Sequence, residues 1–123
     1  MRGTVVLATY NSAGSIAAVL AEVEEAASIL GRSGFRIDIL LVDNDSPDGT
    51  VGIAREQALR LDLELDTIDS PSTHRSGALL AGLRHVLERG EARFIVTLDA
   101  NGHHDARQIT DLVRATKDGV TIE

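Results

Sequence analysis

The sequence predicts a doubly wound α/β fold in three layers, with a mostly parallel β-sheet between two layers of helices. Two observations lead to this prediction. Short apolar runs typical of buried strands alternate along the chain with apolar stripes at helical spacing, in the order βαβαβαβα. The chain has 123 residues, which suits one domain. Parallel neighbours need right-handed crossover connections, so helices should cover both faces of the sheet.

The first half of the chain contains two strand and helix units. Residues 4–8 (TVVLA) form an apolar run that predicts a buried strand, and residues 16–30 carry apolar side chains at the spacing of one helix face. Residues 37–42 (IDILLV) predict the second strand. A turn at residues 46–49 (SPDG) then leads to a shorter helix over residues 51–61.

The second half of the chain continues the same alternation. Residues 61–66 alternate Leu with Asp or Glu, which is typical of a strand with one solvent-facing side. Residues 79–87 predict a third helix, and residues 94–98 (FIVTL) predict a fourth strand. A last helix over residues 109–113 can be capped by Asp105.

The polarity of the strands predicts their order in the sheet. The third strand belongs at an edge because one of its sides is charged, so the order 3-2-1-4 is the most natural one. The fourth strand would then lie at the other edge, although residues 94–98 carry no charge. Either further chain or a second subunit should cover this edge. We therefore expect a homo-oligomer through the edge of the fourth strand.

Composition excludes several classes of protein. The chain has 12 Lys+Arg against 19 Asp+Glu, a net charge of −7, which disfavours nucleic acid as a partner. It has no Cys, so disulfides and thiolate zinc sites are ruled out. Its apolar stretches are far shorter than the roughly 20 residues that cross a bilayer. We expect a soluble chain in the cytoplasm, with the cytoplasmic face of the membrane as an alternative location.

Acidic residues collect where the predicted strands end. In a doubly wound sheet these ends border the crevice between strands 1 and 4, where an acid can bind a divalent cation, a ribose hydroxyl or a base N–H. Asp43 and Asp99 each end an apolar strand directly, which favours a functional role. Asp45, Asp48 and Asp105 are typical turn formers and helix caps.

Three segments resemble a known family, namely residues 6–12 (VLATYNS), 41–50 (LVDNDSPDGT) and 96–105 (VTLDANGHHD). In order and spacing they are similar to the family 2 glycosyltransferases of the GT-A fold, nearest in type to dolichyl- or polyprenyl-phosphate mannosyltransferases. The SPDGT stretch is the most specific piece. The resemblance implies that residues 1–123 form a single nucleotide-sugar-binding domain without the family's C-terminal acceptor half.

The resemblance also implies a function and a site. It implies binding of a GDP- or UDP-linked sugar and transfer of the sugar to a polyprenyl phosphate or another acceptor. It assigns Thr9, Tyr10 and Asp43 to the nucleoside, with the Asp43 carboxylate accepting a hydrogen bond from a base N–H. Asp99 matches the first acid of the family's Asp-X-Asp motif, which contacts ribose or metal. Arg75 lies where the family often has a basic residue near the phosphates. No residue is assigned as the catalytic base.

The implied cofactor is Mg²⁺ or Mn²⁺, held by Asp99 and Asn101. Asn101 stands where the family has the second acid of Asp-X-Asp. An amide oxygen can bind a hard cation but supplies no charge, so we expect weaker metal affinity than in the family.

Other departures from the family pattern leave a second interpretation open. Ala8 and Ser12 replace a Pro and an acid, and His74 stands where Gly is common beside the phosphates. The alternative is a non-catalytic GT-A-like nucleotide-binding or assembly module that has lost turnover. An unrelated dehydrogenase is disfavoured, since no Gly-X-Gly-X-X-Gly follows the first strand, and a receiver-like module does not explain the paired motifs at the strand ends.

Overall fold

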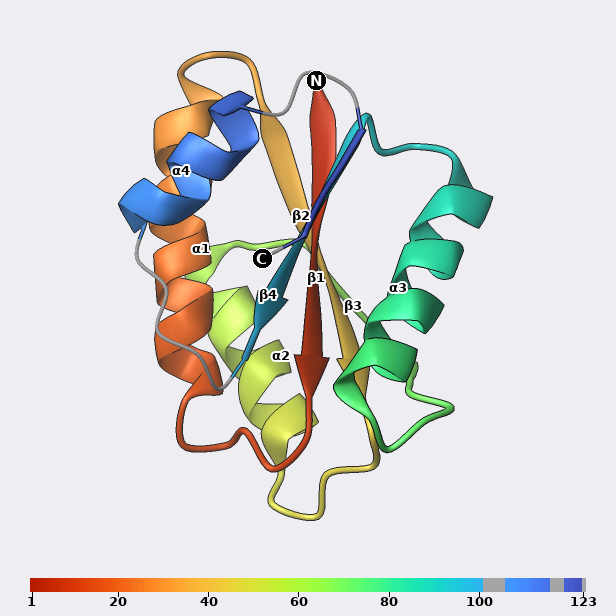
Figure 1. Ribbon diagram of the computed structural model, residues 1–123. Coiled ribbons are helices and arrows are strands. Elements are labelled where there is room, and N and C mark those ends of the chain that lie inside the picture. The colour runs from red at the N-terminus through yellow and green to blue at the C-terminus, as the bar shows by residue number, and fades with distance from the viewer. Residues whose placement is uncertain (101–105, 116–118, 123) are drawn as a thin grey trace.

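The computed structural model describes residues 1–100, 106–115 and 119–122, and it forms a five-stranded sheet between two layers of helices (Figure 1). The elements along the chain are β1 (Arg2–Thr9), α1 (Ile16–Gly31), β2 (Arg36–Asp43), α2 (Thr50–Leu61), β3 (Leu65–Asp69), α3 (Arg75–Arg89), β4 (Phe94–Asp99), α4 (Ala106–Ala115) and β5 (Gly119–Ile122). No helix in the described part is long and apolar enough to span a membrane.

The sheet is parallel throughout, with the strand order β3-β2-β1-β4-β5. Helices α1, α2 and α4 lie on one face, and α3 lies on the other (Figure 1). Each face has its own hydrophobic cluster, the larger one under α1 and the smaller one under α3. The three-layer doubly wound fold and the order 3-2-1-4 are therefore confirmed.

The third strand lies four residues later than predicted, because β3 begins at Leu65. Leu61 ends α2, and Asp62 adopts the left-handed backbone region with φ of 57°. The N–H of Leu63 donates to the carbonyl of Ala58 at 2.8 Å. The alternation of Leu and acids therefore reflects a helix end and a turn that place the leucines against the core. The predicted edge position of the third strand is confirmed.

The prediction that β4 lies at an edge of the sheet was wrong. β5 pairs with β4 in parallel, with Phe94 opposite Gly119 and Thr97 opposite Ile122. β5 has only four residues, which is too short for its sequence pattern to predict a strand. The edge that motivated a homo-oligomer is occupied by this chain's own backbone, so the predicted contact of a second subunit with β4 was also wrong.

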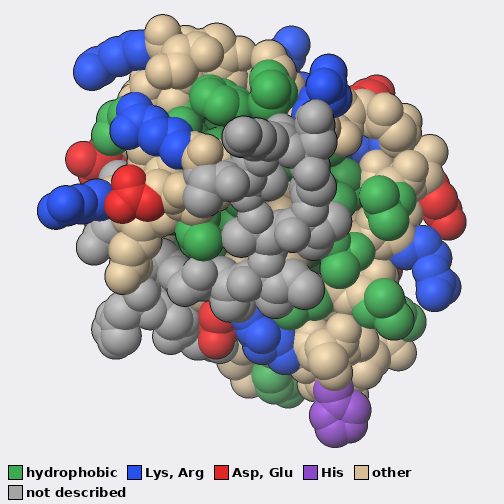
Figure 2. All heavy atoms as spheres, turned by 45° about the horizontal axis from the view of Figure 1, so that its top comes forward, with side chains coloured by type: hydrophobic (Ala, Val, Ile, Leu, Met, Phe, Trp, Pro, Cys, Tyr) green, Lys and Arg blue, Asp and Glu red, His purple; other side chains and the backbone are tan. Residues whose placement is uncertain are grey.

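Helix α3 packs closely on the sheet through Gly82. A Cβ atom at this position would lie 2.6 Å from Cγ1 of Val6 and 3.0 Å from Cγ2 of Val42. The missing side chain lets the helix lie close to β1 and β2. The opposite side of α3 exposes Leu80 and Leu87, and hydrophobic side chains are visible at the surface over this helix in Figure 2.

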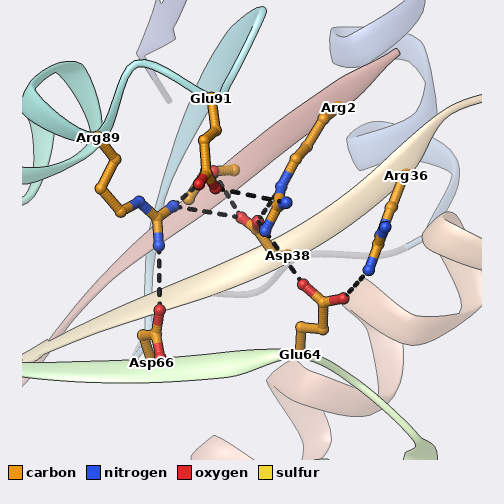
Figure 3. Close-up of polar contacts among 8 residues, drawn as sticks. Arg2, Arg36, Asp38, Glu64, Asp66, Arg89 and Glu91 are labelled. Carbon is orange, nitrogen blue, oxygen red and sulfur yellow. Dashed lines mark hydrogen bonds and ion pairs between the residues drawn. The ribbon is translucent and has the colours of Figure 1, made fainter.

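A network of charged side chains closes the amino ends of the strands (Figure 3). At its centre Asp38 is buried, and it accepts hydrogen bonds from the Thr4 hydroxyl and from Nε of Arg2, the latter at 2.7 Å. The Asp38 hydrogen bond raises the pKa of the Arg2 guanidinium. The ion pairs around this centre are Arg2–Glu64, Arg2–Glu91, Arg36–Glu64, Arg89–Asp38 and Arg89–Asp66. The network ties β1 and β2 to β3 at the end opposite the cleft described below.

Candidate functional site

A cleft of about 210 Å³ opens at the carboxyl ends of β1 and β4. The chain reverses its direction of winding between these two strands, which is where doubly wound sheets bind ligands. The first turn of α3 forms the opposite wall. The lining residues are Ala8, Thr9, Tyr10, Asn44, Ser72, Thr73, His74, Arg75, Ala78 and Asp99.

Four of the residues singled out from the sequence meet in this cleft. Thr9 and Tyr10 come from the end of β1, Arg75 from the start of α3 and Asp99 from the end of β4. Tyr10 is 51% exposed, so part of its side chain is accessible to a ligand. Asn101, predicted as a metal ligand, lies outside the described residues.

Arg75 and Asp99 face each other across the cleft. Nε of Arg75 lies 3.9 Å from Oδ2 of Asp99, and the two side chains are 44% and 43% exposed. An ion pair this long and this exposed adds little to folding stability. It does place one cation and one carboxylate within reach of the same small ligand.

Asp43 lies behind the cleft lining and is only 4% exposed. Its Oδ1 accepts hydrogen bonds from the Thr9 hydroxyl at 2.6 Å and the Ser46 hydroxyl at 2.7 Å. Its Oδ2 accepts one from the N–H of Ser46 at 2.8 Å. A carboxylate offers about four acceptor positions, so these three bonds leave room for one more donor. In the structure Asp43 orients Thr9.

The loop before α3 contributes Ser72 and Thr73, which line the cleft and which the sequence did not single out. The N–H of His74 donates to the Ser72 hydroxyl, which forms a turn that ends at the helix. Gly77 accommodates this turn, because a Cβ atom there would lie 2.5 Å from the Ser72 side chain. His74 is exposed, with an extended backbone (φ −94°) that does not require Gly. The signal available in the sequence was the polar run at residues 70–76 directly before a helix.

The described part of the chain holds no group of three or more His, Asp or Glu side chains that could bind a metal ion. Asp99 is the acidic side chain that lines the cleft. A half-exposed carboxylate is the donor that Mg²⁺ and Mn²⁺ prefer, so the chemistry of Asp99 fits one ligand position of such a cation.

Comparison with known proteins gives consistent results. The sequence profile of glycosyl transferase family 2 matches residues 4–122. The undecaprenyl-phosphate mannosyltransferase of Micrococcus luteus is 31% identical over 126 residues, which cover 95% of this chain and 45% of that protein. The polyprenol monophosphomannose synthase of Mycolicibacterium smegmatis is 30% identical over 122 residues, which cover 98% of this chain and 43% of that protein. The chain thus spans less than half the length of the curated relatives it matches.

A solved structure is also similar. The mannosyltransferase of Pyrobaculum calidifontis, in complex with GDP-Man and Mn²⁺, matches with a TM-score of 0.73 and 25% sequence identity. The match covers 94% of this chain and 32% of that one.

Proposed function

The chain belongs to glycosyl transferase family 2, and from this we propose that its cleft binds a nucleoside diphosphate sugar as the donor for transfer to a polyprenyl phosphate. Donor binding is the step that we assign to residues 1–123. The two curated relatives, whose names specify undecaprenyl phosphate and polyprenol, support a lipid phosphate as the acceptor. The neighbour that holds GDP-Man supports a GDP-linked mannose as the donor.

The nucleoside would lie on the β1 side of the cleft. The exposed ring of Tyr10 offers a face on which a base can stack. The remaining acceptor position of Asp43, on Oδ2, can receive a base N–H. The predicted roles of Thr9, Tyr10 and Asp43 are retained in this proposal.

The diphosphate would lie between α3 and β4. The Arg75 guanidinium supplies positive charge there, and the amino end of α3 adds the partial positive charge of a helix start. Asp99, together with Asn101, would hold Mg²⁺ or Mn²⁺, which when bound neutralises negative charge on the nucleoside diphosphate as it leaves. The Mn²⁺ in the neighbouring structure supports a divalent cation.

The observation that carries this proposal is the cleft itself, in which Tyr10, Arg75 and Asp99 line one space of about 210 Å³. A stacking ring, a cation and a carboxylate are the groups that a base, a diphosphate and a divalent cation require. Calorimetric titration with GDP-mannose, UDP-glucose and UDP-N-acetylglucosamine, first with Mn²⁺ and then with EDTA, tests it. We expect Mn²⁺-dependent binding at micromolar levels, about −8 kcal/mol.

Tyrosine fluorescence gives a second measurement on the same samples. Tyr10 is the only tyrosine, and the chain has no tryptophan, so the emission comes from the cleft alone. A stacked base should quench it. Tyr10→Phe, which keeps the ring, should bind the donor like the original chain by calorimetry, whereas Tyr10→Ala should bind more weakly. Absence of binding for every donor in the presence of Mn²⁺ would contradict the proposal.

A further inference from the structure

The loop between β1 and α1 is held by side chains from the loop that follows β2. Three consecutive backbone N–H groups in the first loop donate to three side-chain oxygens of the SPDGT stretch. The bonds are Asn11 N–H to Ser46 Oγ at 2.9 Å, Ser12 N–H to Thr50 Oγ1 at 2.9 Å, and Ala13 N–H to Asp48 Oδ2 at 3.1 Å. We refer to Ser46, Asp48 and Thr50 together as the clamp.

The local backbone makes this arrangement possible. Asn11 has φ of 51°, in the left-handed region that Asn tolerates better than most residues. A left-handed residue lets successive N–H groups converge on one group of acceptors, an arrangement that elsewhere binds anions. Here the chain's own oxygens fill that position.

Thr50 is the central member of the clamp. It is fully buried, and its hydroxyl accepts from the Ser12 N–H while donating to Oδ1 of Asp48. Asp48 also accepts from the Thr50 N–H at 3.1 Å. Hydrogen bonds in such a chain strengthen one another, and the carboxylate makes its bonds charge-assisted. Loss of the Thr50 hydroxyl would therefore weaken the whole clamp.

The clamp holds the loop without forming part of the cleft wall. Tyr10 and Thr9 line the cleft, whereas Ser46, Asp48 and Thr50 are absent from its lining. At the far end of the loop the Ser15 hydroxyl donates to the carbonyl of Ala100 at 2.8 Å, which ties the loop to the end of β4. The loop that carries Tyr10 is thus fixed from both neighbouring strands.

We propose that Ser46, Asp48 and Thr50 are positioning residues, which set donor affinity by holding the first loop with Tyr10 turned to the cleft. This proposal rests on the proposed function. A loop that visits other conformations binds a ligand more weakly in proportion to the time it spends away from the competent one. The clamp removes that cost before the donor arrives.

The test compares two threonines whose hydroxyls each donate to an aspartate. Thr50→Val removes the clamp hydroxyl, and Thr50→Ser restores it. Thr4→Val is the matched control, because Thr4 is equally buried and donates to Asp38 at the opposite end of the sheet. The measurements are the melting temperature, hydrogen exchange of the amides of residues 11–13, and affinity for GDP-mannose with Mn²⁺.

We expect Thr50→Val to lose amide protection at residues 11–13 and to bind GDP-mannose about three- to tenfold more weakly. Thr50→Ser should recover both properties. Thr4→Val should lower the melting temperature by a comparable amount while leaving loop protection and affinity unchanged. Equal loss of affinity in Thr4→Val and Thr50→Val would overturn the proposal, because the effect would then follow stability alone.

Two further arms keep the result decisive. If Thr50→Val does not fold, Asp48→Asn is used in its place, because Asp48 is exposed. The same loss of affinity for GDP-mannose is expected. If the original chain binds no donor, the proposed function fails, and hydrogen exchange still decides about the clamp. If the amides of residues 11–13 stay fully protected from exchange in both Thr50→Val and Asp48→Asn, the clamp does not hold the loop and the proposal is overturned.

Discussion

Nε of Arg75, at the first position of α3, lies 3.9 Å from Oδ2 of Asp99, at the last position of β4. The two residues are 24 positions apart in the sequence and come from opposite sides of the cleft. Because each side chain is nearly half exposed, the pair contributes little to stability. Under the proposed function, a bound diphosphate would contact Arg75 and a bound cation would contact Asp99.

Asp99→Asn should remove the metal-dependent part of donor binding. The substitution keeps the size of the side chain but removes the charge that attracts the cation, so affinity for GDP-mannose with Mn²⁺ should fall about tenfold or more. With EDTA the variant and the original chain should bind equally. Asp111→Asn, at an exposed position of α4, makes the same change in net charge and serves as the control. Calorimetry decides, and unchanged affinity with Mn²⁺ would exclude Asp99 as a ligand.

Arg75→Ala should weaken donor binding about tenfold with and without Mn²⁺, because a charge-assisted hydrogen bond to phosphate is lost. Its free energy of unfolding should change by less than about 0.5 kcal/mol, since the position is exposed. Arg84→Ala, at an exposed position in the middle of the same helix, should leave the affinity unchanged. Equal donor affinities of Arg75→Ala and Arg84→Ala would show that Arg75 does not contact the donor.

Gly82→Ala should destabilise the protein by about 1 to 3 kcal/mol, because the new methyl group would overlap Val6 and push α3 from the sheet. Gly52→Ala, in α2 with open space around the new Cβ, should instead stabilise it by about 0.5 to 1 kcal/mol. Chemical denaturation of both variants measures the two changes. If both substitutions changed the free energy of unfolding in the same direction, the packing role of Gly82 would be contradicted.

The clamp should weaken in acid. The hydrogen bond from the Thr50 hydroxyl, with the amides of Ala13 and Thr50, lowers the pKa of the Asp48 carboxyl. A lowered pKa in the folded state means that its contribution is complete above the ordinary pKa of about 4 and is lost as the pH falls through the lowered value. The NMR amide shift of Ala13 should therefore stay constant from pH 7 to about pH 5 and move below about pH 4. In Asp48→Asn the Ala13 amide shift should no longer change below about pH 4.

The strand and helix order, the three layers and the family were predictable from the sequence, because they depend on local patterns. Buried strands such as residues 94–98 are uncharged and mostly apolar, and SPDGT is a continuous motif. The third strand was misplaced because the leucines at residues 61–65 satisfy the pattern of a strand and also that of a helix end packed on the core. β5 escaped prediction because four residues carry too little pattern.

From the sequence, the position of Asp99 at the end of a buried strand and the family resemblance of Thr9 and Tyr10 predict a donor site. The spatial relationships among these residues came from the tertiary structure. In the structure Arg75 lies opposite Asp99, and Asp43 lies behind the cleft lining and binds Thr9. Side chains of the SPDGT stretch accept hydrogen bonds from the first loop. The physical reason is that each of these relationships joins residues more than 20 positions apart. Their distances depend on strand register and helix packing, which no local pattern encodes.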